Sequence, residues 1–277
     1  MMQAFFSVMF GLVYFDLGKD QTSIQNRQGI LFFTAMNVSF GGPISVSQVV
    51  PAQLKVVNAE RASRTYRELS YLLSIFTVNL PLESVPQLIT ASAMYFMVNL
   101  RGGSGHFLQY FAILLAENFA GIGIGLALSV SLSKPEMAGQ IAPAITVLFL
   151  MFSGYFLNES SIPVFLRWFK YLSFVRYAFQ ALAVNEFRGA NFHCRGALAD
   201  EVCLTKGGDV LKQLDFDNVH ISNNLAILAA MILAFNALAL TIFMVRRPRF
   251  LPFSTPKAAT SPSSKKGLPV SPAVVLG

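Results

Sequence analysis

The stretch "NVHISNNLAILAAMILAFNALALTIFMV", residues 218–245, contains no Asp, Glu, Lys or Arg. About 20 apolar residues in a helix cross the roughly 30 Å hydrocarbon core of a bilayer, so this stretch predicts a membrane-spanning helix. Four more windows of sufficient length carry at most one acidic residue each: residues 28–54, 69–100, 107–133 and 137–158. The sequence therefore predicts an all-α membrane protein with five full spans.

The composition agrees with a membrane protein. The chain has 277 residues, of which 54% are hydrophobic and only 13% are charged, and this is too apolar for an ordinary soluble domain. The opening run "AFFSVMFGLVYF", residues 4–15, would rise only about 18 Å as a helix, which is too short to cross alone. It lacks the basic start and the cleavage site of a signal peptide. We interpret it as part of a first span whose beginning is missing.

The basic residues predict the orientation. The net charge of +7 comes from residues between the spans and in the tail, and this pattern does not indicate nucleic-acid binding. Basic clusters in 55–67 and 246–249 directly follow spans, so we expect both on the cytoplasmic side. Residues 16–27 and 159–219 then lie outside. The Pro-, Ser- and Ala-rich segment 251–277 predicts a disordered cytoplasmic tail.

The outer segment 159–219 contains an amphipathic stretch and both cysteines. Trp168 and Tyr171 lie in this stretch among basic residues, which predicts either helices along the membrane interface or a buried re-entrant pair. Cys194 and Cys203 face an oxidising compartment, so we expect a disulfide, with two free thiols as the alternative. No metal site or catalytic constellation is predicted.

Four motifs resemble one family of membrane proteins. They are "NRQGILFF" (26–33), "AERASRTYRELSY" (59–71), "LPLESVPQLITASAMYFMVNL" (80–100) and "FSGYFLNESSIPVFLRWFKYLSFVRYAFQALAVNEFRG" (152–189). From about residue 5 to about residue 250 the chain resembles the transmembrane domain of the ABCG (white-brown complex) half-transporters of the ATP-binding cassette superfamily. The resemblance implies a six-span ABC exporter-type domain, here with a truncated first span and a partial helix at 4–15. The expected full spans are 29–50, 70–100, 107–132, 138–157 and 221–245.

The resemblance also implies a function and partners. Family members pair as homo- or heterodimers in the membrane lipid and export hydrophobic small molecules or lipids. They bind ATP and Mg²⁺ on a nucleotide-binding domain, but this sequence contains no G-x-x-x-x-G-K-[ST] phosphate loop. We therefore expect no cofactor in this chain. The alternative is a non-pumping membrane subunit that pairs with a complete half-transporter. The plasma membrane is the expected location.

The resemblance assigns candidate residues to a substrate slot between the second and fifth spans. An apolar pocket with one amide can hold hydrophobic molecules by stacking and orient them by one hydrogen bond. Simple helix packing is the alternative for all of them. The slot residues are Phe33, Asn37, Phe40, Pro143, Val147 and Leu150.

A gate and a coupling helix follow from the same resemblance. Tyr155 and Phe156 occupy the position of an apolar gate, with lipid-facing aromatics as the alternative. Glu60, Arg61 and Arg67 belong to a short coupling helix that would press on the nucleotide-binding domain, with a solvated loop as the alternative.

Three features inside the predicted spans are unusual for hydrocarbon. Glu83 and Glu117 each lie within a span, where an unpaired carboxylate is expensive, so we expect both to be partnered or neutral. Gly121 and Gly125 form a small-xxx-small pair that favours close helix packing.

Overall fold

A computed structural model describes residues 2–62, 68–132, 137–156, 164–194 and 203–245. These residues form helices, with β-type pairing only at two isolated bridges, Asp20 with His193 and Asn191 with Lys206. The helices are α1 (Met2–Val13), α2 (Gln21–Ala62), α3 (Glu68–Met97), α4 (Ser104–Ser131), α5 (Ala138–Met151), a 3₁₀ turn (Val164–Leu166), α6 (Phe169–Leu172), α7 (Phe174–Phe187), α8 (Gly207–Gln213) and α9 (Ile221–Val245). The predicted all-α class is confirmed. The tail predicted at 251–277 lies outside the described residues.

Within the described residues, four helices are long and apolar enough to cross a membrane: Gln21–Leu54 of α2, Leu69–Met97 of α3, Ser104–Ser131 of α4 and Ile221–Val245 of α9. The remaining expected full span, 138–157, contains a shorter helix in the structure. Its helix α5 has 14 residues, about 21 Å, and ends at Met151. The chain then turns at Gly154, whose φ of 89° is unfavourable for a residue with a side chain.

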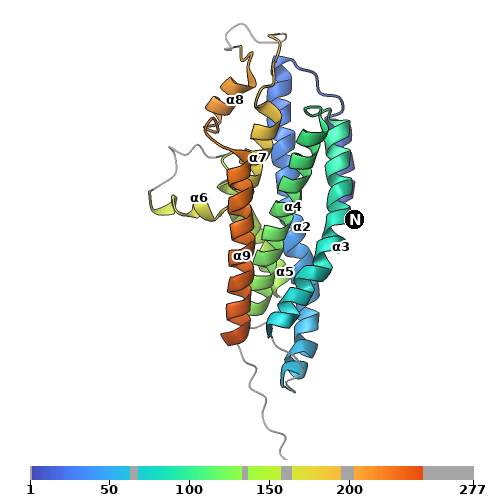
Figure 1. Cartoon of the computed structure of the whole chain (residues 1–277), viewed down its shortest axis with the longest axis vertical. Coiled ribbons are helices and arrows are strands. Elements are labelled where there is room, and N and C mark those ends of the chain that lie inside the picture. Colours follow the sequence, from blue (N-terminus) through green and yellow to red (C-terminus); the bar gives the residue numbers. More distant parts are fainter. Residues whose placement is uncertain (1, 63–67, 133–136, 157–163, 195–202, 246–277) are drawn as a thin grey trace, which may run out of the picture. The chain divides into compact units, whose positions relative to one another are not determined.

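Helix α4 lies at the centre of the packing. It pairs most extensively with α2 and α9, and Figure 1 shows it between these two helices. Buried residues make up 72% of its span window, against 6% for α3 and 17% for α9. Because α3 and α9 expose apolar side chains, they present the surface that hydrocarbon would cover.

The small residues of α4 allow the close approach of α2. A Cβ atom added at Gly125 would lie 2.7 Å from the carbonyl oxygen of Pro43, and one at Gly121 would lie 2.8 Å from the Pro43 ring. Neither distance leaves room for a methyl group. The two glycines of the small-xxx-small pair therefore pack directly against α2.

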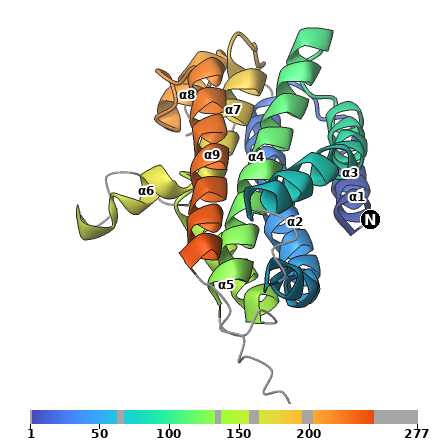
Figure 2. The ribbon, with the colours of Figure 1, turned by 60° about the horizontal axis from the view of Figure 1, so that its bottom comes forward.

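The amphipathic stretch divides into two parts with different environments. In α6 and the residue before it, Tyr171 and Trp168 are both more than 60% exposed, and Figure 2 shows this short helix extending away from the bundle. In α7, Phe174, Phe179 and Phe187 are fully buried against the neighbouring helices. The exposed aromatics suit a membrane interface, whereas α7 is a buried helix.

Candidate substrate pathway

Helices α2 and α5 pack side by side and carry the residues expected to line the slot. Phe40 and Pro143 are half-buried, and Val147 is 47% exposed. Leu150 is 5% exposed and belongs to the hydrophobic core. These side chains therefore share one pair of helices but not one environment.

Phe33 and Asn37 face α1. The Phe33 ring stacks on Phe10 with 5.3 Å between ring centroids. The Asn37 side-chain amide donates to the Gln3 carbonyl oxygen at 3.1 Å and to Ser7 Oγ at 3.2 Å. Because α1 occupies both hydrogens of the amide, Asn37 can donate to a ligand only if α1 moves.

The two predicted gate residues lie on an aromatic cluster that begins in α2. The Tyr155 ring stacks on Phe32 at 4.4 Å, and the Phe156 ring meets Phe32 edge-on at 5.0 Å. Phe179 of α7 contacts both Phe32 and Tyr155 edge-on. Tyr155 is half-buried and Phe156 is 62% exposed. Phe32 was not predicted, although it stands next to Phe33 in the quoted motif 26–33. One step along the helix turns it by about 100° from Phe33, toward Tyr155.

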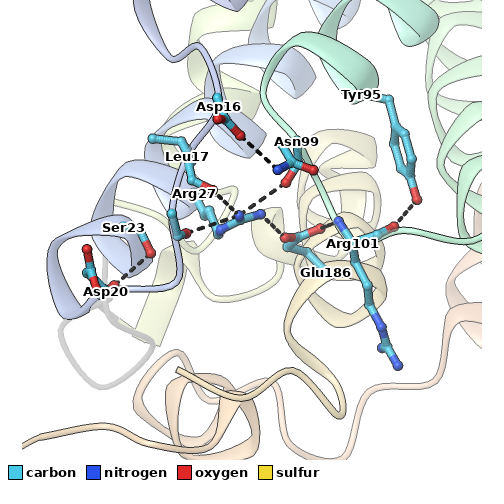
Figure 3. A network of polar contacts seen from close by, with 10 residues as sticks. Asp16, Leu17, Asp20, Ser23, Arg27, Tyr95, Asn99, Arg101 and Glu186 are labelled. Carbon is cyan, nitrogen blue, oxygen red and sulfur yellow. Dashed lines mark hydrogen bonds and ion pairs between the residues drawn. The ribbon is translucent and has the colours of Figure 1, made fainter. Parts of the chain in front are cut away.

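At the end of the bundle where α2 begins, which the basic residues predict to be the outer end, a buried ion pair joins α2 to α7 (Figure 3). Arg27 Nη1 donates to Glu186 Oε1, and each side chain is 5% exposed. Arg27 Nη2 donates to the carbonyl oxygens of Leu17 and Asn99 at 2.8 and 3.1 Å. The second carboxylate oxygen of Glu186 accepts the backbone N–H of Arg101 at 2.8 Å.

Further polar contacts extend this outer network. Tyr95 donates its hydroxyl hydrogen to the Arg101 carbonyl oxygen. Arg101 Nη1 donates to the Arg188 carbonyl oxygen. Asn99 Nδ2 donates to Asp16 Oδ1 at 2.9 Å. The network therefore fixes the turn between α1 and α2 to the turn between α3 and α4. The sequence reasoning did not identify it, although Arg27 and Glu186 lie in two of the quoted motifs.

The acidic residues inside the bundle have partners. Glu117 is fully buried, and its Oε1 accepts a hydrogen bond from Ser39 Oγ at 2.6 Å, which links α4 to α2. Glu83 Oε2 accepts from Asn118 Nδ2 at 3.3 Å, which links α3 to α4. Both acids thus contribute to contacts between helices.

The remaining candidates lie at the two ends of the bundle. Glu60 and Arg61 belong to the last turn of α2, where the Glu60 side chain is exposed, and Arg67 lies outside the described residues. At the outer end, Cys194 and Cys203 form a disulfide. The described residues contain no group of three or more His, Cys, Asp or Glu side chains that could hold a metal ion.

Comparison with known proteins identifies the family. Residues 1–187 match the family described as ABC-2 type transporter. The chain is 29% identical over 253 residues to ABC transporter G family member 1 of Dictyostelium discoideum, covering 89% of this chain and 32% of that protein. It is 28% identical over 246 residues to Protein white of Drosophila melanogaster, covering 88% and 36%. With Broad substrate specificity ATP-binding cassette transporter ABCG2 of Sus scrofa it shares 30% identity over 190 residues, covering 68% and 29%.

The chain spans about a third of the length of these curated relatives. The matched residues include the helices from α1 to α7, and α8 and α9 lie beyond them. This integral membrane protein belongs to the ABC-2 type transporter family and corresponds to the transmembrane part of an ABCG transporter.

Proposed function

We propose that the chain is the membrane part of an ATP-driven exporter of hydrophobic small molecules or lipids in the plasma membrane. It works as a homo- or heterodimer, and nucleotide-binding domains outside this chain bind the ATP and Mg²⁺. One observation carries the proposal: α5, which packs against α2, leaves Val147, Leu148 and Met151 between 46% and 48% exposed.

This exposed face suits one wall of a pathway. A second subunit that presents the same face would enclose an apolar space between two α2–α5 pairs, as an isologous interface does. Apolar molecules bind such a space by burial of their surface, without any need for a charged partner. Phe40 and Val147 would then contact the transported molecule.

The length of α5 supports a constriction above this space. At about 21 Å, α5 does not cross the hydrocarbon core, and the turn that follows it carries Tyr155 and Phe156. The stack of Tyr155 on Phe32 holds one of these rings against α2. Bulky rings at that level would separate the apolar space from the outer solution until the subunits change conformation.

Transport by vesicles tests the proposal. The chain would be produced within a polypeptide that also contains a nucleotide-binding domain, and ATP-dependent uptake of a hydrophobic dye would be measured in inside-out vesicles. We expect Phe40→Ala to weaken the apparent affinity for the dye, and Val147→Trp to lower the maximal rate by filling the pathway. Phe96→Ala is the control, because Phe96 is 68% exposed on α3, away from α5.

Two results would contradict the proposal. The absence of ATP-dependent uptake by the unchanged protein would reject transport of this substrate class. Normal uptake by both Phe40→Ala and Val147→Trp would reject the α2–α5 pathway and leave transport itself intact.

A further inference from the structure

A cavity lies away from the α2–α5 face, between the cytoplasmic halves of α2 and α3. Its volume is ≈ 850 Å³, in the upper part of the range of about 300–1,000 Å³ that is typical of sites for drug-sized ligands. Val46, Val49 and Val78 contribute to its apolar walls. We call this cavity the α2–α3 groove. It extends from Glu60 in the last turn of α2 to Glu83 in the middle of α3.

The described lining of the groove contains charges of one sign only. Glu60 and Glu83 line it, and the described residues contribute no Lys, Arg or His to its lining. Glu60 lies at the end of its helix, near the level of water, whereas Glu83 lies at membrane depth. A carboxylate at that depth is costly without a compensating charge, and an ionisable residue in a span marks a functional site by default.

Polar groups next to Glu83 lack partners. Asn118 is fully buried and donates to Glu83 Oε2, but its own Oδ1 has no hydrogen-bond partner among the described residues. One turn further along α3, Gln87 is fully buried, and neither its oxygen nor its nitrogen finds a partner in the described part of the chain. Unsatisfied amides are expensive in hydrocarbon. Neither amide belongs to the groove lining, so at the deep end Glu83 is the charged group that a ligand would meet.

We propose that the α2–α3 groove binds a lipophilic cation. The apolar body of the ligand packs against the valines of the groove, and its positive charge faces the Glu83 carboxylate. Asn118 positions that carboxylate through its hydrogen bond. The ligand offsets the cost of a charge at membrane depth and buries apolar surface at the same time. Binding here involves neither the α2–α5 pathway nor ATP, so this proposal stands apart from the proposed transport.

Two ions of the same shape and opposite charge test the binding. The full chain would be purified in phosphatidylcholine nanodiscs, and saturable binding of labelled tetraphenylphosphonium would be measured against that of tetraphenylborate, with empty nanodiscs subtracted. We expect saturable binding of the cation only. Glu83→Gln should weaken it by about tenfold or more, the scale of one charge-assisted contact of ~1.4 kcal/mol, whereas Glu83→Asp should retain most of it.

A second pair of variants tests the groove without changing its charge. Ser74→Trp places a large ring in the groove, because Ser74 lines it from α3. Val85→Trp adds the same ring on the same helix at a position that is 61% exposed and outside the groove lining. We expect Ser74→Trp to abolish binding of tetraphenylphosphonium and Val85→Trp to leave it unchanged.

Three outcomes would overturn the proposal. Equal saturable binding of both ions would indicate a groove for uncharged lipid-like molecules. Unchanged cation binding by Glu83→Gln would remove the charge contact. Equal losses in Ser74→Trp and Val85→Trp would place the ligand elsewhere on the protein.

Discussion

Arg27 and Glu186 form a buried ion pair although 159 positions separate them in the chain. Arg27 also donates to backbone carbonyl groups in the turn after α1 and in the turn after α3. Glu186 in return accepts the backbone N–H of Arg101. One arginine and one glutamate therefore join four segments at the outer end of the bundle.

Removal of one charge from this pair should destabilise the protein strongly. Glu186→Gln leaves the Arg27 guanidinium buried without its counter-charge, and the loss expected for such a change is about 3–5 kcal/mol in the free energy of unfolding. The measurement is the thermal stability of the purified protein in detergent micelles, followed by size-exclusion chromatography after heating.

An exposed ion pair in the same protein provides the control. Lys212 and Asp209 approach to 3.7 Å with side chains 69% and 44% exposed. Lys212→Ala should change the free energy of unfolding by less than about 1 kcal/mol, because water already screens this pair. Equal stability losses in Glu186→Gln and Lys212→Ala would contradict the structural role assigned to the buried pair.

The contact between Gly125 and Pro43 predicts a second loss of stability. A Cβ atom at Gly125 would lie 2.7 Å from a backbone oxygen, so Gly125→Ala must push α2 and α4 apart, at a typical cost of about 1–3 kcal/mol. Gly139→Ala is the matched control, because nothing lies within 4 Å of a Cβ at Gly139 of α5. There the better helix propensity of alanine should make the change neutral or slightly stabilising. Thermal midpoints that shift equally in both variants would count against close packing at Gly125.

The four long apolar helices of the described residues overlap windows that the sequence marks by a local property. Whether a segment is apolar over about 20 residues can be read directly from its letters, and this predicted α2, α3, α4 and α9. The same criterion failed for the end of α5, since the uncharged window continues beyond Met151. Apolar residues do not reveal whether the backbone stays helical. The glycine at position 154 was the signal in the sequence that the helix ends, because the chain turns there with a positive φ.

The site was harder to predict because its contacts are not local. The motif that contains Arg27 gave no indication that Glu186 would be its partner, since only the packing of α2 against α7 brings them together. The adjacent residues Phe32 and Phe33 are identical in type. Only the helical phase turns Phe32 to Tyr155 and Phe33 to α1.

The disulfide between Cys194 and Cys203 provides a test of both covalent structure and orientation. Intact cells that express the chain should show no labelling of these thiols by a maleimide until a reductant is added. A membrane-impermeant reductant should suffice if this segment faces the exterior, as the basic residues after α2 and α9 predict. Because the bond restricts the unfolded chain, Cys203→Ser should lower the free energy of unfolding by about 2–3 kcal/mol for a loop of this length. Labelling without reduction would contradict the bond, and labelling only after permeabilisation would contradict the orientation.

The stack between Phe32 and Tyr155 should contribute a measurable coupling energy. Phe32 is 3% exposed and contacts Tyr155, Phe156 and Phe179, so Phe32→Ala should cost about 3–5 kcal/mol through the cavity that it leaves. Phe33→Ala should cost less, because Phe33 is only half-buried.

A double-mutant cycle isolates the ring contact from the cavity. Tyr155→Phe keeps the ring and should be nearly neutral, whereas Tyr155→Ala removes it. The ring centroids lie 4.4 Å apart, which indicates that the two rings interact. The double variant Phe32→Ala/Tyr155→Ala should therefore lose about 0.5–1.5 kcal/mol less stability than the sum of the two single variants. Strict additivity would mean that the two rings stabilise the protein independently. The contact with Phe32 would then not hold the Tyr155 ring against α2, and the proposed role of Tyr155 in a constriction would lose this support.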